Sequence, residues 1–85
     1  MEILYKPTFV RQYNKLDKNL QDEVLEKIDL LKNTDNHKLL KVHKLHGEMD
    51  QYYSFYVNYK IRIVFSWKNE KEIHFLAIGD HDIYK

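Results

Sequence analysis

Three short stretches of this 85-residue chain contain side chains that can transfer protons or bind anions. The chain ends in GDHDIYK, which places His81 between two aspartates and just before Tyr84. Residues 37–47, HKLLKVHKLHG, hold three histidines and three lysines but no acid, and we call them the connector. The stretch KIRIVF contains Arg62. A fold that brings these stretches together would place proton donors and acceptors beside cations.

This set of side chains suits the cleavage of RNA without a metal ion. Such cleavage needs a base for the 2′-OH, an acid for the departing 5′-oxygen, and a cation for the charge of the transition state. Histidine suits both proton transfers because its unperturbed pKa is about 6.5. The planar fork of arginine matches phosphate oxygens, and an aromatic ring can carry an unstacked base. These roles could fall to groups in the connector, the strand and the folded-back tail: His43, His46, Arg62, His81 and Tyr84.

Each candidate also has a structural interpretation. His43 and His46 can be ordinary loop residues, and Arg62 can be a salt-bridged surface residue. His81 can be a histidine held by hydrogen bonds from its neighbours. The spacing of His37, His43 and His46 also raises the possibility of zinc, but the chain has no cysteine and no helical metal motif. We therefore disfavour a metal site and expect no cofactor.

The composition is that of a small globular domain. Hydrophobic residues make up 44% of the chain and aromatic residues 14%, which excludes a disordered polypeptide. At this length we expect a single domain, residues 1–85. The absence of cysteine excludes a disulfide framework, and no apolar run approaches the roughly 20 residues of a membrane span. We expect a soluble cytoplasmic protein with no membrane partner; the net charge of +1 does not by itself indicate nucleic-acid binding.

The hydrophobic pattern predicts helices first and strands later in the chain. EILY, residues 2–5, predicts a strand, and residues 7–16 predict a helix that begins at Pro7. A second helix, capped by Asp17 or Asn19, follows from one apolar stripe: Leu20, Val24, Leu25, Ile28 and Leu31. We expect these helices to form an antiparallel hairpin.

Alternating patterns then predict three strands joined by short turns, in residues 52–57, 60–67 and 72–79. This order predicts an α+β fold in which an N-terminal strand and a two-helix hairpin pack on one face of an antiparallel sheet. In the middle strand Ile61 and Ile63 face the helices, so Arg62 projects from the opposite face. In the last strand we expect Ile73, Phe75 and Ala77 on one face and His74, Leu76 and Ile78 on the other.

The whole pattern resembles the RelE/ParE superfamily of bacterial and archaeal toxins. The resemblance covers essentially the whole chain: a strand, two helices, HxLxG at residues 43–47, YYSFYVNYKIRIVF, and FLAIGDHDIYK. It is greatest to the RelE and YafQ-like branch, whose members are ribosome-dependent mRNA interferases of type II toxin–antitoxin systems. This implies a RelE-like domain with a catalytic C-terminal tail. Such an enzyme cleaves mRNA in the ribosomal A site by metal-independent attack of the 2′-OH, leaving a 2′,3′-cyclic phosphate and a 5′-OH end.

The resemblance implies a catalytic role for four residues. His81 would be the general acid, and Tyr84 would stack on or orient the substrate nucleotide. Arg62 would contact the scissile phosphate. His43 would be the base.

Three connector residues would bind RNA: Lys41, Lys44 and His46. The sequence also departs from the family pattern, because HKLLK lacks the glutamate that some relatives use as a base. Lys60 and Tyr56 stand roughly where YafQ-like toxins place an aspartate and a histidine.

Two other functions remain open. One is a ParE-like inhibitor of DNA gyrase, which binds a protein and cleaves nothing, and the other is a degenerate toxin that survives as an antitoxin-binding module. The fold cannot separate them, but His81 and Tyr84 with Arg62 favour the nuclease. Each function implies a cognate antitoxin as partner, and the nuclease adds the ribosome and mRNA. Operator DNA would be contacted only through the antitoxin complex.

Overall fold

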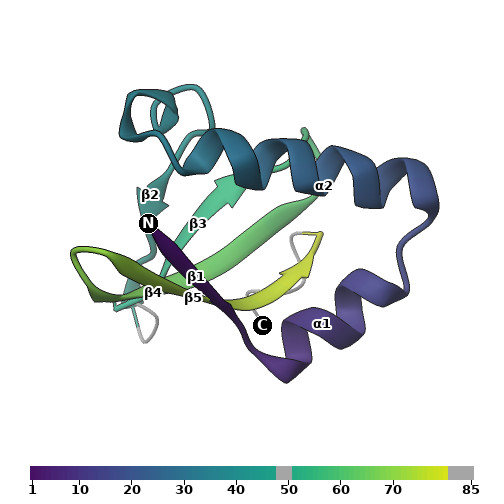
Figure 1. The fold of residues 1–85 in the computed structure, drawn as a ribbon, viewed down its shortest axis with the longest axis horizontal. Coiled ribbons are helices and arrows are strands. Elements are labelled where there is room, and N and C mark those ends of the chain that lie inside the picture. Colours follow the sequence, from purple (N-terminus) through teal and green to yellow (C-terminus); the bar gives the residue numbers. More distant parts are fainter. Residues whose placement is uncertain (48–50, 81–85) are drawn as a thin grey trace.

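The structure is a computed structural model that describes residues 1–47 and 51–80. In these ranges it has two layers, with two helices on one face of a five-stranded sheet (Figure 1). The elements are β1 (Glu2–Tyr5), α1 (Pro7–Asn14), α2 (Lys18–Leu31), a 3₁₀ turn η1 (Thr34–Asn36), β2 (His43–Lys44), β3 (Tyr53–Tyr56), β4 (Arg62–Asn69) and β5 (Glu72–Gly79). The predicted α+β class is confirmed.

The sheet is mixed, with the strand order β1-β5-β4-β3-β2. Strands β3, β4 and β5 form the predicted antiparallel meander. The prediction of an antiparallel sheet with the N-terminal strand packed on it was wrong, because β1 lies within the sheet and pairs parallel to β5. A parallel pair needs a long crossover connection, which the helices and the earlier strands supply. The connector also contributes the short strand β2, which pairs with β3.

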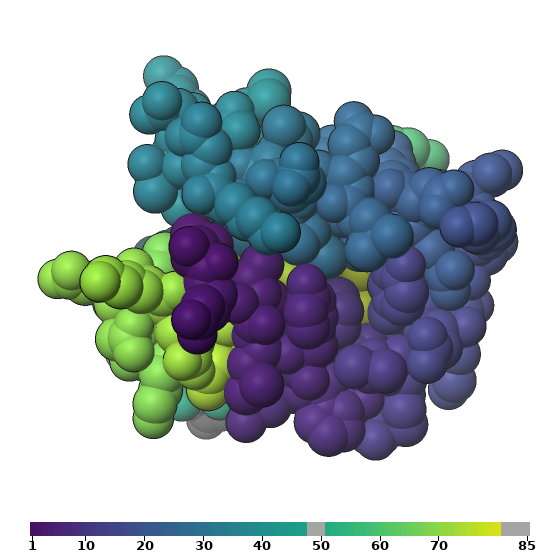
Figure 2. All heavy atoms as spheres, viewed as in Figure 1, coloured from purple at the N-terminus to yellow at the C-terminus, as the bar shows by residue number. Residues whose placement is uncertain are grey.

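The helix starts follow the sequence signals. Pro7 is the first residue of α1, and the Asp17 side chain caps α2 by accepting a hydrogen bond from the Leu20 N–H at 2.9 Å. The chain turns back after α1, and α2 runs across the sheet (Figure 1). From this side the helices cover most of the sheet, while the β4–β5 hairpin extends beyond them (Figure 2). Neither helix of the described ranges has the length and apolar character required to cross a membrane.

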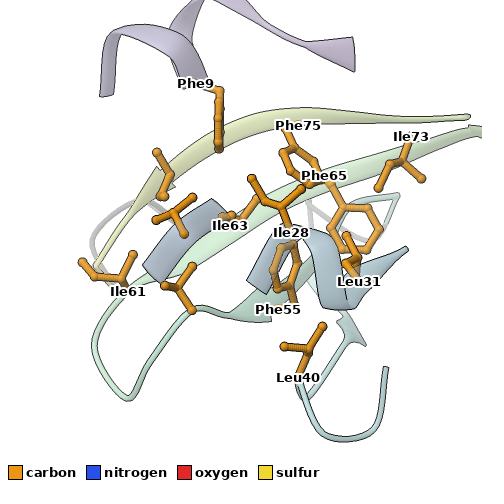
Figure 3. Close-up of a cluster of buried hydrophobic side chains, with 13 residues drawn as sticks. Phe9, Ile28, Leu31, Leu40, Phe55, Ile61, Ile63, Phe65, Ile73 and Phe75 are labelled. Atoms are coloured by element: carbon orange, nitrogen blue, oxygen red, sulfur yellow. The ribbon is translucent and has the colours of Figure 1, made fainter. Parts of the chain in front are cut away.

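Aromatic rings dominate the core between the two layers (Figure 3). Phe9 of α1 points onto the sheet, where its ring centre lies 5.4 Å from that of Phe75. Phe55 and Phe65 continue the cluster, with ring centres 5.9 Å apart, and all four rings are at least 97% buried. Leu40 of the connector is also buried in this core, at 2% exposure. The connector is therefore anchored beside the sheet.

A bulge in β5 changes which side chains face the core. Residues 64 and 65 of β4 pair with Ala77 and Phe75, so Leu76 is an extra residue in β5. Ile78, at 2% exposure, therefore follows Phe75 into the core. The prediction that Ala77 shares a face with Phe75 and that Ile78 faces away was wrong. An alternating pattern of apolar residues gives no sign that one extra residue is inserted in the strand.

Candidate functional site

Arg62 lies on the face of the sheet opposite the helices, as predicted. Its neighbours Ile61 and Ile63 are in the core, at 8% and 0% exposure. Its cross-strand partner on β3 is Tyr56. The guanidinium carbon lies 4.5 Å from the centre of the Tyr56 ring, and Nη2 donates a hydrogen bond to the Tyr56 hydroxyl at 3.3 Å. A neutral ring therefore holds the guanidinium in place.

Lys41 approaches the same ring from the connector. Its Nζ lies 5.4 Å from the centre of the Tyr56 ring. The backbone supports this approach, because the Tyr56 N–H donates to the Leu40 carbonyl at 2.9 Å. With Leu40 buried in the core, the hydrogen bond ties the connector to the end of β3. One tyrosine thus contacts two cations from different parts of the chain.

The backbone of Lys41 has an unusual conformation. Its φ of +57° is the only positive φ of a non-glycine residue in the described ranges. The Lys41 N–H donates to the Lys38 carbonyl at 3.1 Å, and the Val42 N–H donates to the His37 carbonyl at 2.9 Å. These two bonds form the Schellman motif that ends helical turns, in which this position is usually glycine. A lysine here costs backbone strain, and such strain is often found at functional sites.

His43, the first residue of β2, lies near the same Tyr56 ring. Its ring centre is 6.3 Å from that of Tyr56. Nδ1 lies 2.8 Å from the Lys41 carbonyl oxygen, and a carbonyl can only accept, so Nδ1 carries a proton. The neutral ring therefore has its lone pair on Nε2, which lies 3.2 Å from the hydroxyl of the fully buried Ser54. Nε2 is the atom of this ring that can accept a proton.

We call Lys41, His43, Tyr56 and Arg62 the cationic cluster. Within residues 1–47 and 51–80, neither Lys41 nor Arg62 forms an ion pair with a carboxylate. Among the described residues, therefore, the group in contact with both cations is a neutral ring and not an acid. The two cations are suited to binding a phosphate group, and the histidine of the cluster is suited to transferring a proton to or from the bound ligand.

Other predicted site residues do not join the cluster. Lys44 pairs with Tyr53, so strand alternation points it to the side opposite His43. His46 is exposed, two residues beyond β2. His81 and Tyr84 lie outside the described residues.

The remaining histidines have structural partners. His37 Nε2 lies 2.9 Å from the carbonyl oxygen of Leu31 at the end of α2. His74 is partly buried, and its Nε2 lies 2.6 Å from Glu72 Oε2. No three histidine, aspartate or glutamate side chains in the described part of the chain lie close enough to hold a metal ion.

Sequence reasoning missed the central role of Tyr56. The signal was present, because strand alternation puts Tyr56 on the same face as Ser54, away from Phe55 and Val57. A tight turn after Val57 then pairs Tyr56 with Arg62. The conformation of Lys41 had no signal in the sequence.

The fold is similar to that of solved toxin structures. YafQ from E. coli strain BL21(DE3) has a TM-score of 0.80 and 16% identity, over 98% of this chain and 96% of that one. The YoeB/ParE toxin from Agrobacterium tumefaciens has a TM-score of 0.77 and 19% identity, over 95% and 99%. The E. coli DinJ–YafQ toxin–antitoxin complex contains a chain with a TM-score of 0.75 and 19% identity, over 96% and 93%.

At these identities the likeness establishes the fold. The chain has the fold of RelE/ParE-type toxins, which confirms the fold that the sequence resemblance predicted. No protein-family model matches the sequence, and no curated protein matches it.

Proposed function

We propose that this chain is the toxin of a type II toxin–antitoxin system and an endoribonuclease that cleaves mRNA in the ribosomal A site. The observation that carries the proposal is the cationic cluster. Arg62 and Lys41 lie over one neutral ring, and no described carboxylate pairs with either. The ring centre of His43, which has an acceptor nitrogen, lies 6.3 Å from that of the same tyrosine. The fold, shared with toxins of this type, supports the same function.

In the proposed reaction the scissile phosphate binds at Arg62 and Lys41. His43 Nε2 accepts the proton of the 2′-OH, and the 2′-oxygen attacks phosphorus. The hydrogen bond from Ser54 to Nε2 is long, at 3.2 Å, so a substrate hydroxyl can compete for this nitrogen. Arg62 and Lys41 stabilise the charge that develops on the phosphate oxygens.

The tail completes the proposed reaction. His81 protonates the departing 5′-oxygen, and Tyr84 orients the substrate nucleotide. The products are a 2′,3′-cyclic phosphate and a 5′-OH end, and no metal ion takes part. Lys44 and His46 contact RNA outside the cationic cluster.

The proposed partners are a cognate antitoxin, the ribosome and mRNA, and the proposed location is the cytoplasm. The likeness to the chain in the DinJ–YafQ toxin–antitoxin complex supports the antitoxin. Operator DNA would be reached only through the antitoxin complex.

The test compares matched substitutions of the same residue type. Arg62→Ala is paired with Arg11→Ala, because Arg11 is an exposed residue of α1 that bonds locally to Thr8. His43→Gln is paired with His74→Gln, because His74 is bonded to Glu72 on β5. Each variant is induced in a bacterial host, mRNA 5′ ends are mapped, and gyrase supercoiling is assayed. Cleavage rates are then measured on purified ribosomes loaded with mRNA.

We expect cleavage within codons that leaves 5′-OH ends. Arg62→Ala should lower the cleavage rate about 10²–10³-fold, the typical effect of removing one donor to a developing charge. His43→Gln should lower it by about 10²–10⁴-fold, and the two control variants should cleave as the wild type does. Inhibited supercoiling with intact mRNA would instead identify a gyrase inhibitor. If neither activity is present while an antitoxin still binds, the chain is an antitoxin-binding module.

A further inference from the structure

An open groove lies beside the cationic cluster. It has a volume of about 560 Å³ and forms where the end of α2, the connector and the chain leaving β3 meet. Its lining includes Leu39 and Lys41 of the connector, Tyr56 at the end of β3, and Tyr59 in the turn that follows β3. The volume falls within the range of about 300–1,000 Å³ that is usual for small-ligand sites.

Two large apolar side chains in this lining are highly exposed. Tyr59 is 89% exposed and Leu39 is 71% exposed, which makes them the most exposed large hydrophobic residues of the described ranges. One exposed apolar side chain needs no explanation, but here the two most exposed ones line the same concave surface. A flat ring and an aliphatic side chain are suited to stacking against a planar ligand.

The groove is continuous with the cationic cluster. Lys41 and Tyr56 line the groove, and both also belong to the cluster. A ligand bound by its phosphate at Arg62 and Lys41 can therefore extend into the groove without leaving the protein surface. The lining also includes the polar side chains Glu26 and Lys27 of α2, which can meet the edge of a base.

We infer that this groove binds the nucleotide adjacent to the phosphate held by the cationic cluster, with its base stacked on Tyr59 and Leu39. The inference rests on the proposed function and adds to it a base-binding subsite. Lys41, the cation shared by the groove and the cluster, favours a nucleotide over a protein segment, because it matches the phosphate to which every base of an RNA strand is linked. The size also fits, because a volume of about 560 Å³ lies within the range of small-ligand sites. Contacts to one base would give the enzyme a preference among neighbouring nucleotides.

Two probes separate the subsite from the phosphate site. The first is inorganic phosphate, which can occupy only the cationic cluster. The second is a trinucleotide with 2′-O-methyl groups, which binds as RNA does but cannot be cleaved because it lacks the attacking hydroxyl. Affinities of the full chain for both probes are measured by NMR titration.

The variants are matched to isolate the groove. Tyr59→Ala removes the ring and Tyr59→Phe keeps it. Leu39→Ala is paired with Leu25→Ala, because Leu25 is also an exposed leucine, at 52%, but lies outside this groove. Arg62→Ala reports on the phosphate site itself. Tyr59 and Leu39 are exposed enough that their replacement should leave the fold intact, which thermal unfolding checks.

We expect Tyr59→Ala to weaken trinucleotide binding about tenfold, from the usual contribution of stacking on one base, and to leave phosphate binding unchanged. Tyr59→Phe and Leu25→Ala should bind as the wild type does, and Leu39→Ala should bind more weakly. Unchanged trinucleotide affinity in Tyr59→Ala and Leu39→Ala, with loss in Arg62→Ala, would overturn the subsite alone. If Arg62→Ala also changes nothing, the phosphate site of the proposed function fails as well. If the groove variants lose a co-purified antitoxin but keep RNA binding, the groove is a protein site and the inference is wrong.

Discussion

Replacing Lys41 by glycine should make the protein less active, and more stable than replacing Lys41 by alanine. Lys41 has a φ of +57° at the end of a Schellman motif. For a residue with a Cβ atom this conformation costs roughly 1–2 kcal/mol, and glycine avoids that cost. Glycine also loses more backbone freedom on folding, which offsets about 0.5–1 kcal/mol. Glycine at this position should therefore exceed alanine by about 0.5–1 kcal/mol in the free energy of unfolding.

Lys41→Ala is the matched reference for this gain. Both variants remove the ammonium group and its contact with the Tyr56 ring, so they differ only in whether the left-handed conformation is strained. Glycine should exceed alanine by about 2–8 °C in Tm, since about 1 kcal/mol corresponds to about 4–8 °C in a domain of this size. Both variants should cleave mRNA more slowly than the wild type, and to the same degree, because both lack the charge.

Lys38 provides a control at which glycine should be less stabilising than alanine, the opposite of the difference expected at Lys41. It lies in the same turn but has no positive φ, so Lys38→Gly should be less stable than Lys38→Ala. Stability is measured by thermal and urea denaturation followed by circular dichroism, and activity on ribosomes loaded with mRNA. If Lys41→Gly is no more stable than Lys41→Ala, the strain assigned to the connector does not exist. If both variants cleave at the wild-type rate, the Lys41 charge plays no part in catalysis.

Three further predictions concern the elements that position the cluster. Asp17→Ala removes the cap of α2 and should lower the free energy of unfolding by about 1 kcal/mol; an unchanged urea midpoint would contradict this. Phe75→Ala opens a cavity at the centre of the aromatic core and should lower the free energy of unfolding by about 3–5 kcal/mol. That loss is enough to leave a marginally stable domain partly unfolded. A cooperative unfolding transition near the wild-type Tm would contradict the packing described. Ser54→Ala removes the hydroxyl beside His43 Nε2 and should lower the free energy of unfolding by about 1 kcal/mol. Much of this loss should disappear when the substitution is made in the His43→Gln variant. An equal loss with and without His43→Gln would show that the two side chains do not interact.

Much of the fold could be predicted from local patterns. Apolar spacing predicted both helices and the three-stranded meander, Asp17 and Pro7 predicted the helix starts, and alternation placed Arg62 opposite the core. These patterns are reliable because they depend on which face of a single element is buried. They did not predict that β1 pairs parallel to β5, or that one extra residue, Leu76, turns Ile78 into the core. Pairing and bulges depend on the neighbouring strand, which lies far away in the sequence.

The amino-acid sequence is enough to show which side chains are available for chemistry and which face of its strand carries Arg62. The meeting of Lys41, His43 and Arg62 at Tyr56 depends on the tertiary fold. Two non-local events produce this meeting: the β3–β4 register that pairs Tyr56 with Arg62, and the hydrogen bond from Tyr56 to Leu40 that holds the connector against β3. The strained left-handed conformation of Lys41 persists because the burial of Leu40 and its hydrogen bond to Tyr56 fix the connector directly before Lys41. A local sequence pattern carries no information about how these segments meet, because the free energy that stabilises the meeting comes from contacts between residues distant in the sequence.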